Sequence, residues 1–274
     1  MRFMRRLILI SNPGRETEGN YQPTTTSVID RFENFFKSNI GGKWENREID
    51  KYGENRPLNV DEMHNIMAEL DSQNCEYSMI VFCGHGGAAG NGEDGIQLPR
   101  TVDVQTPNCF PISRLISQNE ANDVRHRIKR TVILDACRTI IPVTPQQLFE
   151  GDIARQVLRM NGDSCCRHYN EIIAQNMPHV ELLQSTSPNA PAHATRMGSE
   201  YADQVFKIVN EQTSLWHSRA IINNHFVYSM RNLHNDVLTN IANTTRRQIP
   251  QFRIIGDESI GFPFAAICSP HILI

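Results

Sequence analysis

Short apolar runs alternate with amphipathic segments along most of this 274-residue chain, and that order constrains the fold more than any other feature. The apolar runs indicate buried strands at Leu7–Ser11, Met79–Cys83, Thr131–Leu134, Val180–Ser185 and Phe262–Cys268, with a further strand at Trp44–Ile49. Apolar residues recur at helical spacing over Ser27–Asn39, Val60–Leu70, Ser199–Val209 and Leu233–Thr245. We therefore expect an α/β fold, a three-layer sandwich whose mostly parallel sheet of about six strands carries helices on both faces.

Two segments show no clear pattern: Gly86–Asn108, which is rich in Gly, Asn and Pro, and Ile141–Asn176. We interpret both as long excursions from one domain spanning residues 1–274, and the second is the expected place of disorder or cleavage. Within that domain we distinguish a first part at 1–140, a connecting segment at 141–178 and a last part at 179–274.

The charge balance limits the partners of the protein. The chain carries 27 Lys and Arg against 30 Asp and Glu, a formal net charge of −3. Proteins that coat nucleic acid or bind membranes through polybasic patches are strongly positive, so we expect neither partner. The apolar run Leu7–Ile10 is far shorter than the ~18 residues that span a bilayer, and Ser11–Gly14 ends it before a signal peptide is complete. We therefore expect a cytoplasmic protein.

The cysteines form no recognisable disulfide or zinc pattern. Their number is odd, no CxxC pair is present, and the positions are Cys75, Cys83, Cys109, Cys137, Cys165, Cys166 and Cys268. The histidines lack zinc-ligand spacing, and the acidic pairs Glu93–Asp94 and Asp257–Glu258 are too sparse to indicate calcium. No metal or other cofactor is predicted.

Two of the buried strands end in residues that carry nucleophile chemistry. His85 follows the run Met79–Cys83 between glycines, and Cys137 follows the run Thr131–Leu134. Neighbouring parallel strands place their carboxyl ends at one edge of the sheet, where active sites collect. An imidazole beside a thiol raises the thiolate fraction and can later protonate a leaving amine. We therefore predict a Cys–His pair in one crevice.

Other interpretations exist for each residue taken alone. A His between glycines is more often a loop residue, a Cys after an apolar run is more often an inert buried thiol, and Asp135 could cap a turn. The loop Gly84–Gly90 also begins with the dinucleotide-binding pattern G-x-G-x-x-A. That pattern should open a helix after the first strand, whereas further glycines follow it here after the third expected strand. A nucleotide-binding α/β enzyme is kept as an alternative.

The sequences Phe-Cys-Gly-His-Gly-Gly at 82–87 and Leu-Asp-Ala-Cys-Arg-Thr at 134–139 carry a family resemblance. They resemble the two motifs of the caspase-like (clan CD, family C14) cysteine peptidases, which lie ~50 residues apart. Asp135 is the residue found at this position in metacaspases, orthocaspases and paracaspases, where caspases proper have Gln. Weaker likeness extends over Thr26–Asp30, Leu182–Ser187, Gly198–Ala202, Gln248–Gln251 and Phe262–Phe264.

The resemblance implies an endopeptidase that needs no cofactor and acts through an acyl-enzyme. Cys137 would attack the scissile carbonyl, and His85 would act as general base and acid. The backbone N–H groups of Gly86 and Cys137 would form the oxyanion hole, where one lost donor typically costs about 10²–10³ in rate. The parts at 1–140 and 179–274 would correspond to the large and small subunits of the family.

The resemblance also implies cleavage after Arg or Lys. Asp135 would line the pocket for the side chain before the cut bond, and a buried carboxylate there selects a basic residue. Asp30 matches the second pocket acid of metacaspases, although Thr26-Ser27 replaces the usual Gly-Cys. A basic preference makes Arg155, Arg159 and Arg167 candidate self-cleavage sites, with a solvated helix face as the alternative.

The biological setting is inferred from the resemblance alone. It implies a stand-alone bacterial enzyme that cleaves protein or peptide substrates in stress, cell-death or defence responses. The sequence identifies no activating partner. The main alternative is a catalytically silent scaffold with the same fold, and the intact His85, Gly86 and Cys137 count against it.

Overall fold

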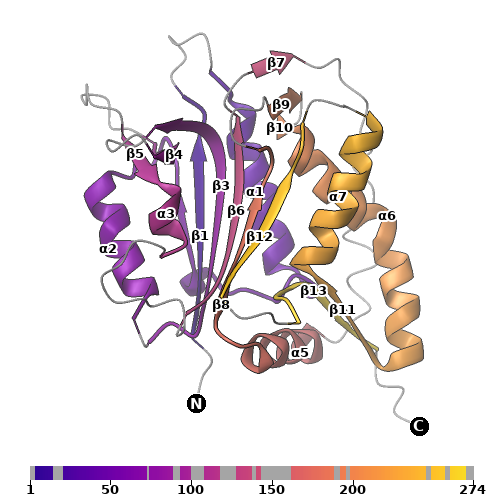
Figure 1. Cartoon of the computed structure of the whole chain (residues 1–274). Helices are drawn as coiled ribbons and strands as arrows, with labels where there is room; N and C mark the ends of the chain where they lie inside the picture. Colours follow the sequence, from indigo (N-terminus) through magenta and orange to yellow (C-terminus); the bar gives the residue numbers. More distant parts are fainter. Residues whose placement is uncertain are drawn as a thin grey trace.

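The computed structural model describes residues 4–14, 21–72, 74–88, 93–99, 108–117, 128–137, 140–142, 162–187, 192–195, 198–244, 248–256 and 260–269. A central sheet runs through the molecule and helices cover both of its faces (Figure 1). The expected α/β architecture with a mostly parallel sheet is therefore confirmed. None of the described helices is both long and apolar enough to cross a membrane.

The central sheet has the spatial order β12, β8, β6, β3, β1, β2 among the described residues. All neighbouring pairs are parallel except β12, which runs antiparallel to β8. The end of β3 continues beyond this sheet and pairs with β4, which pairs with β5. The bounds are β1 (Arg5–Asn12), β2 (Ile49–Tyr52), β3 (Tyr77–Ala88), β4 (Asp94–Gln97), β5 (Cys109–Pro111), β6 (Lys129–Cys137), β8 (His179–Gln184) and β12 (Gln251–Gly256).

Each face of the sheet has its own hydrophobic core. Leu7 and Leu9 of β1 pack in the cluster formed with α1, α5, α6 and α7, whereas Ile8 and Ile10 pack on the opposite face with α2 and α3. Successive strand residues point to opposite faces, so strands buried on both faces are continuous apolar runs. The helices are α1 (Thr24–Lys37), α2 (Val60–Leu70), α3 (Ile112–Leu115), α5 (Gly162–Gln175), α6 (Glu200–Asn223) and α7 (Met230–Thr244).

Local sequence explains where two of these helices begin. The Asn59 side chain accepts a hydrogen bond from the Glu62 amide at the start of α2, and the Ser199 side chain accepts one from the Ala202 amide at the start of α6. Such caps satisfy amide groups that have no partner inside the helix. Ser199 thereby fixes the first turn of α6, which lies beside the candidate site.

The last strands differ from the sequence expectation. The run Phe262–Cys268 does form a strand, β13 (Pro263–Cys268), but it pairs with β11 (His225–Ser229) outside the central sheet. The sixth strand of the central sheet is instead β12, whose residues are only partly buried. An edge strand needs less apolar surface than an inner one, so its sequence does not form a continuous apolar run.

Smaller differences concern the loops and excursions. The strand expected at Trp44–Ile49 begins later, because Asn46–Glu48 forms the 3-10 turn η1 before β2. The excursion Gly86–Asn108 contains β4, and Ile141–Asn176 contains most of α5. A separate three-stranded sheet has the order β10, β9, β7, with β7 (Ile140–Pro142), β9 (Ala192–Thr195) and β10 (Gly198–Ser199).

Candidate active site

His85 and Cys137 are cross-strand partners at the carboxyl ends of β3 and β6. The parallel register pairs Cys83 with Asp135, Gly84 with Ala136 and His85 with Cys137. The backbone of the two expected catalytic residues therefore meets at one edge of the central sheet. For Cys137 the structure describes the backbone and not the side chain.

The His85 ring is held by the segment that follows β1. The side chain is buried, and its Nε2 lies 3.3 Å from the carbonyl oxygen of Pro13. Gly84 permits this approach: it has a φ of +157°, and a Cβ there would lie 2.6 Å from the Asn12 carbonyl oxygen. The glycine before His85 is therefore required for the close contact between β3 and β1.

Gly86, the expected oxyanion-hole residue, lies where β3 leaves the central sheet. It pairs with Ile96 of β4. Together with Leu134, Ala136 and the segment 184–187 that follows β8, it borders a cavity of about 20 Å³, which is about the size of one water molecule. The ends of β3, β6 and β8 therefore converge on one small hollow on the α2–α3 face of the sheet, which neither His85 nor Asp135 lines.

Asp135 is a buried carboxylate with an incomplete set of partners. One oxygen accepts hydrogen bonds from the Ser199 hydroxyl and, at 3.9 Å, from the Cys83 thiol. The other oxygen, Oδ1, is buried and has no hydrogen-bond partner among the described residues. Burial, reinforced by the nearby Asp203 carboxylate, raises the pKa of Asp135 to about 6, and the neighbouring Ser199 and Ser185 hydroxyls limit the rise. A cationic group in contact with Oδ1 would favour the ionised form.

Asp30 is not brought to Asp135. Its half-exposed carboxylate forms an ion pair with Lys51 of β2, and Lys51 also contacts Glu33 at 2.8 Å. β2 is an edge strand, and β1 and β3 separate it from β6. The Asp30 carboxylate therefore contacts Lys51 in the described part of the chain, and the expectation that both acids line one pocket stays a prediction.

Asp203 is the acid that sequence analysis missed. It lies in the first turn of α6, is 4% exposed, and its charge acts on Asp135. Arg31 of α1 donates to one of its oxygens at 2.9 Å, and the Thr195 hydroxyl donates to the other at 2.5 Å. No motif marks this position, and the only available signal is its spacing of four residues from Ser199 on one helix face.

The candidate self-cleavage sites are only partly described. Arg167 lies exposed on α5, and the neighbouring Asn170 of that helix accepts a hydrogen bond from Arg5 at the start of β1. Arg167 is therefore at the opposite end of the sheet from His85. Arg138, Arg155 and Arg159 lie outside the described residues.

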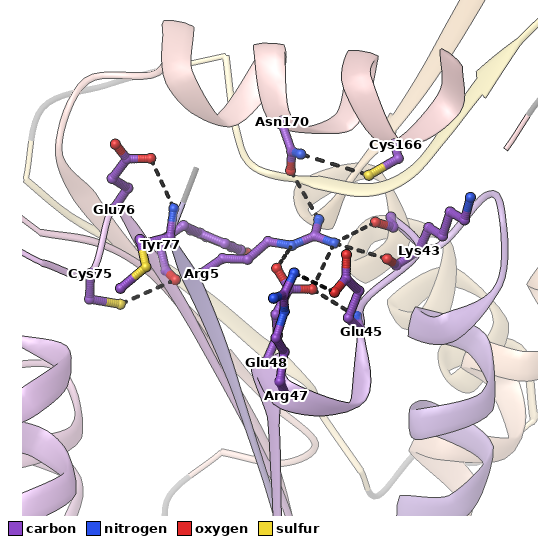
Figure 2. Close-up of polar contacts among 12 residues, drawn as sticks. Arg5, Lys43, Glu45, Arg47, Glu48, Cys75, Glu76, Tyr77, Cys166 and Asn170 are labelled. Carbon is purple, nitrogen blue, oxygen red and sulfur yellow. Dashed lines mark hydrogen bonds and ion pairs between the residues drawn. The ribbon is translucent and has the colours of Figure 1, made fainter. Parts of the chain in front are cut away.

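The larger cavity is also at that opposite end. It has a volume of about 390 Å³, and its lining includes Arg5, Arg6 and Arg47. Arg5 pairs with Glu48 and Arg47 with Glu45 (Figure 2). Arg6 pairs with Asp50, so the three positive charges of the lining are balanced. No group of three possible metal ligands occurs within the described ranges.

Three comparisons with known proteins bear on this site. The caspase-domain family matches residues 28–255, which is most of the chain. A crystal structure of a Geobacter sulfurreducens protein matches with a TM-score of 0.54 and 10% identity, over 97% of this chain and 98% of that chain. The Drosophila initiator caspase Dronc matches with a TM-score of 0.53 and 9% identity, over 97% of this chain and 83% of that chain. At such identities the two structures show a shared fold. No curated protein sequence matches significantly.

Proposed function

Because the chain belongs to the caspase-domain family, whose members are generally cysteine peptidases, we propose that it is a cysteine endopeptidase that uses Cys137 and His85. One observation carries the proposal: the register of β3 and β6 pairs these two residues at the carboxyl edge of the sheet. Families with this fold collect their active sites at that edge.

The proposed reaction is acyl transfer followed by hydrolysis. The Cys137 sulfur attacks the scissile carbonyl while His85 takes the thiol proton, and His85 then gives that proton to the leaving amine. Water hydrolyses the acyl-enzyme and regenerates the thiol. The Pro13 carbonyl contact with Nε2 fixes the ring and leaves Nδ1 for proton transfer. The amides of Gly86 and Cys137 are the proposed donors to the oxyanion.

We propose that the substrate residue before the cut bond is Arg or Lys. The buried and partnerless Oδ1 of Asp135 supports a cationic ligand, and the Asp203 charge adds to the negative potential. A substrate Asp in that place would be repelled, whereas a guanidinium can bond a carboxylate with two parallel donors. We propose Asp203, which pairs with Arg31 but still acts electrostatically on Asp135, as a second acid near this pocket.

The test is cleavage-site profiling of a peptide library by mass spectrometry, with wild type, Cys137→Ala and Cys75→Ala compared. Cys75 is a half-buried thiol away from the site and serves as the matched control. We expect cuts after Arg or Lys that vanish only in Cys137→Ala. Cuts after Asp or apolar residues would still support catalysis by the Cys–His pair, but they would contradict the proposal that Asp135 selects Arg or Lys.

If the wild-type protein cleaves no peptide of the library, a second experiment tests the proposal. An active-site thiol probe should label Cys137 at least tenfold faster than Cys75, because a neighbouring imidazole raises the thiolate fraction. Equal rates would support the alternative of a catalytically silent scaffold. The bacterial stress or defence setting remains a proposal based on the family resemblance.

A further inference from the structure

Two free thiols meet where α5 packs against β13, away from the proposed active site (Figure 1). Cys165 is fully buried in the first half of α5, and Cys268 is the last residue of β13. The backbone amide of Cys268 donates a hydrogen bond to the Cys165 sulfur at 3.2 Å. The Cys268 thiol donates a hydrogen bond to the carbonyl oxygen of Ser164, the residue before Cys165. Both side chains of the pair therefore lie at the same contact between α5 and β13.

These contacts bring the two cysteines within reach of a disulfide. An N–Cα bond is about 1.46 Å long, so the Cys268 Cα lies no more than about 4.7 Å from the Cys165 sulfur, given the 3.2 Å contact. Disulfides form when the two Cα atoms are roughly 4.4–6.8 Å apart and the sulfurs face each other. A small rotation of the Cys268 thiol, which now donates to the Ser164 carbonyl at 3.4 Å, would complete the approach.

The adjacent Cys166 points elsewhere, which makes the pairing specific. Its sulfur accepts a hydrogen bond from Asn170, whose side-chain oxygen in turn accepts one from Arg5 (Figure 2). Consecutive helix residues are separated by about 100° around the axis, so Cys165 and Cys166 cannot both face β13. Cys166 is therefore a matched control within the same helix turn.

We propose that Cys165 and Cys268 form a redox modification site, a thiol pair that a hydroperoxide converts into an intramolecular disulfide. In the first step one thiol is oxidised to a sulfenic acid and the hydroperoxide is reduced to an alcohol, or to water when it is hydrogen peroxide. In the second step the other thiol displaces hydroxide from the sulfenic sulfur, and the S–S bond forms with release of water. Two thiols lose two electrons in total, and the peroxide O–O bond accepts them.

Burial determines how fast these thiols should be oxidised and how slowly the disulfide should be reduced. Burial raises the pKa of the Cys268 thiol to about 12, and it also raises the pKa of Cys165. A thiol that is rarely ionised reacts slowly with peroxide, so the pair suits sustained oxidation more than brief exposure. Burial also limits the access of reductants to the sulfur atoms, so dithiothreitol should reduce such a disulfide slowly but completely. It would tie α5 to the final strand across 103 residues of chain.

The test uses the full-length protein, reduced and then treated with hydrogen peroxide. Non-reducing peptide mapping by mass spectrometry should find one dominant cross-linked pair, joining the peptide that holds Cys165 to the one that holds Cys268. Cys166→Ser should keep this pair, and Cys268→Ser should lose it. The apparent Tm of the oxidised wild type should rise by about 5–10 °C, because a long loop is closed in the unfolded chain, and dithiothreitol should reverse the rise.

Two outcomes would overturn the proposal. The first is a wild type in which half-buried Cys75 is oxidised while Cys165 and Cys268 remain thiols. The second is a cross-link that Cys166→Ser abolishes, because the partner of Cys268 would then be Cys166. Neither outcome depends on peptidase activity, so the proposed function and the redox site can fail independently.

Discussion

The two ends of the central sheet differ in how their buried charged side chains are hydrogen-bonded. At the start of β1, Arg5 is buried and its guanidinium donates to Glu48, to Asn170 and to the carbonyl oxygens of Gly42 and Lys43 (Figure 2). At the other end, Asp135 is equally buried but its Oδ1 has no hydrogen-bond partner within the described part of the chain.

This difference suggests a structural role for the Arg5 cation and a ligand-binding role for the Asp135 carboxylate. A buried charge whose donors are all used holds neighbouring elements in one arrangement, and Arg5 joins β1 to η1 and α5 in this way. A buried oxygen without a partner costs stability and suggests that a ligand supplies the partner. Arg5 is therefore a packing element of the amino edge, whereas the open Asp135 oxygen belongs to a group of buried polar atoms without a partner among the described residues, which also includes Glu181 Oε2 and Arg6 Nε.

The largest expected effect concerns the proposed base. His85→Ala should lower kcat/KM for an Arg-containing peptide by about 10³–10⁴ and leave the Tm nearly unchanged, because general base catalysis is lost without a loss of core packing. Peptide hydrolysis and thermal unfolding measure the two quantities, with the exposed His225→Ala as control. An active His85→Ala protein would move the catalytic centre away from this edge.

The next effect tests the amino edge. Arg5→Met should lower the free energy of unfolding by about 3 kcal/mol, because Glu48 would remain largely buried without its cation. The kcat/KM per folded molecule should change by less than about twofold, since the site lies at the other end of the sheet. Urea unfolding and peptide hydrolysis would show this. A large activity loss at unchanged stability would contradict the separation of the two ends.

Asp135→Asn should weaken cleavage and strengthen the fold. Cleavage after Arg should fall about 100-fold, because the substrate cation loses its buried counter-ion. The pKa of Asp135 is about 6 in the folded protein and 3.8 ordinarily. The folded state therefore binds the Asp135 proton more tightly than the unfolded state does. This tighter binding stabilises the fold below about pH 4, and the stabilisation is lost as pH rises from about 4 to 6.

The stability part of that effect has a defined pH window. Above pH 6, Asp135→Asn should be more stable than wild type by roughly 3 kcal/mol, and the difference should shrink toward zero near pH 4. Urea unfolding of both proteins between pH 4 and 8 measures it, with the exposed Asp163→Asn as control. A stability difference that does not vary with pH would mean that Asp135 is not buried as described.

The smallest effect concerns Asp30. Asp30→Ala should change stability by less than about 1 kcal/mol, because a half-exposed ion pair contributes little. Cleavage after Arg should change by less than twofold, whereas Asp203→Asn should lower the pKa of Asp135 by removing a nearby negative charge. The rate of cleavage after Arg, measured across pH for Asp30→Ala and Asp203→Asn, tests both expectations. A tenfold loss in Asp30→Ala would restore the family assignment of this residue.

The sequence predicted the elements that local physics controls. Continuous apolar runs indicated the inner strands, because a strand buried on both faces needs an apolar residue at every position. The residues that follow two of these runs identified His85 and Cys137, and the parallel register pairs them because their strands are neighbours in the sheet. The edge strand β12 was missed because its half-buried pattern resembles a loop.

The tertiary structure alone decided which side chains surround Asp135. Ser199 and Asp203 come from a helix that begins more than sixty residues along the chain, and their approach depends on how α6 packs on the sheet. Asp30 and Arg31 are adjacent in sequence, yet they face different partners because successive residues of a helix point in directions about 100° apart. The sequence by itself therefore determined the inner strands and the residues at the ends of two of them, His85 and Cys137. The electrostatic surroundings of that pair followed only from helix packing, because burial and charge proximity are properties of the assembled fold.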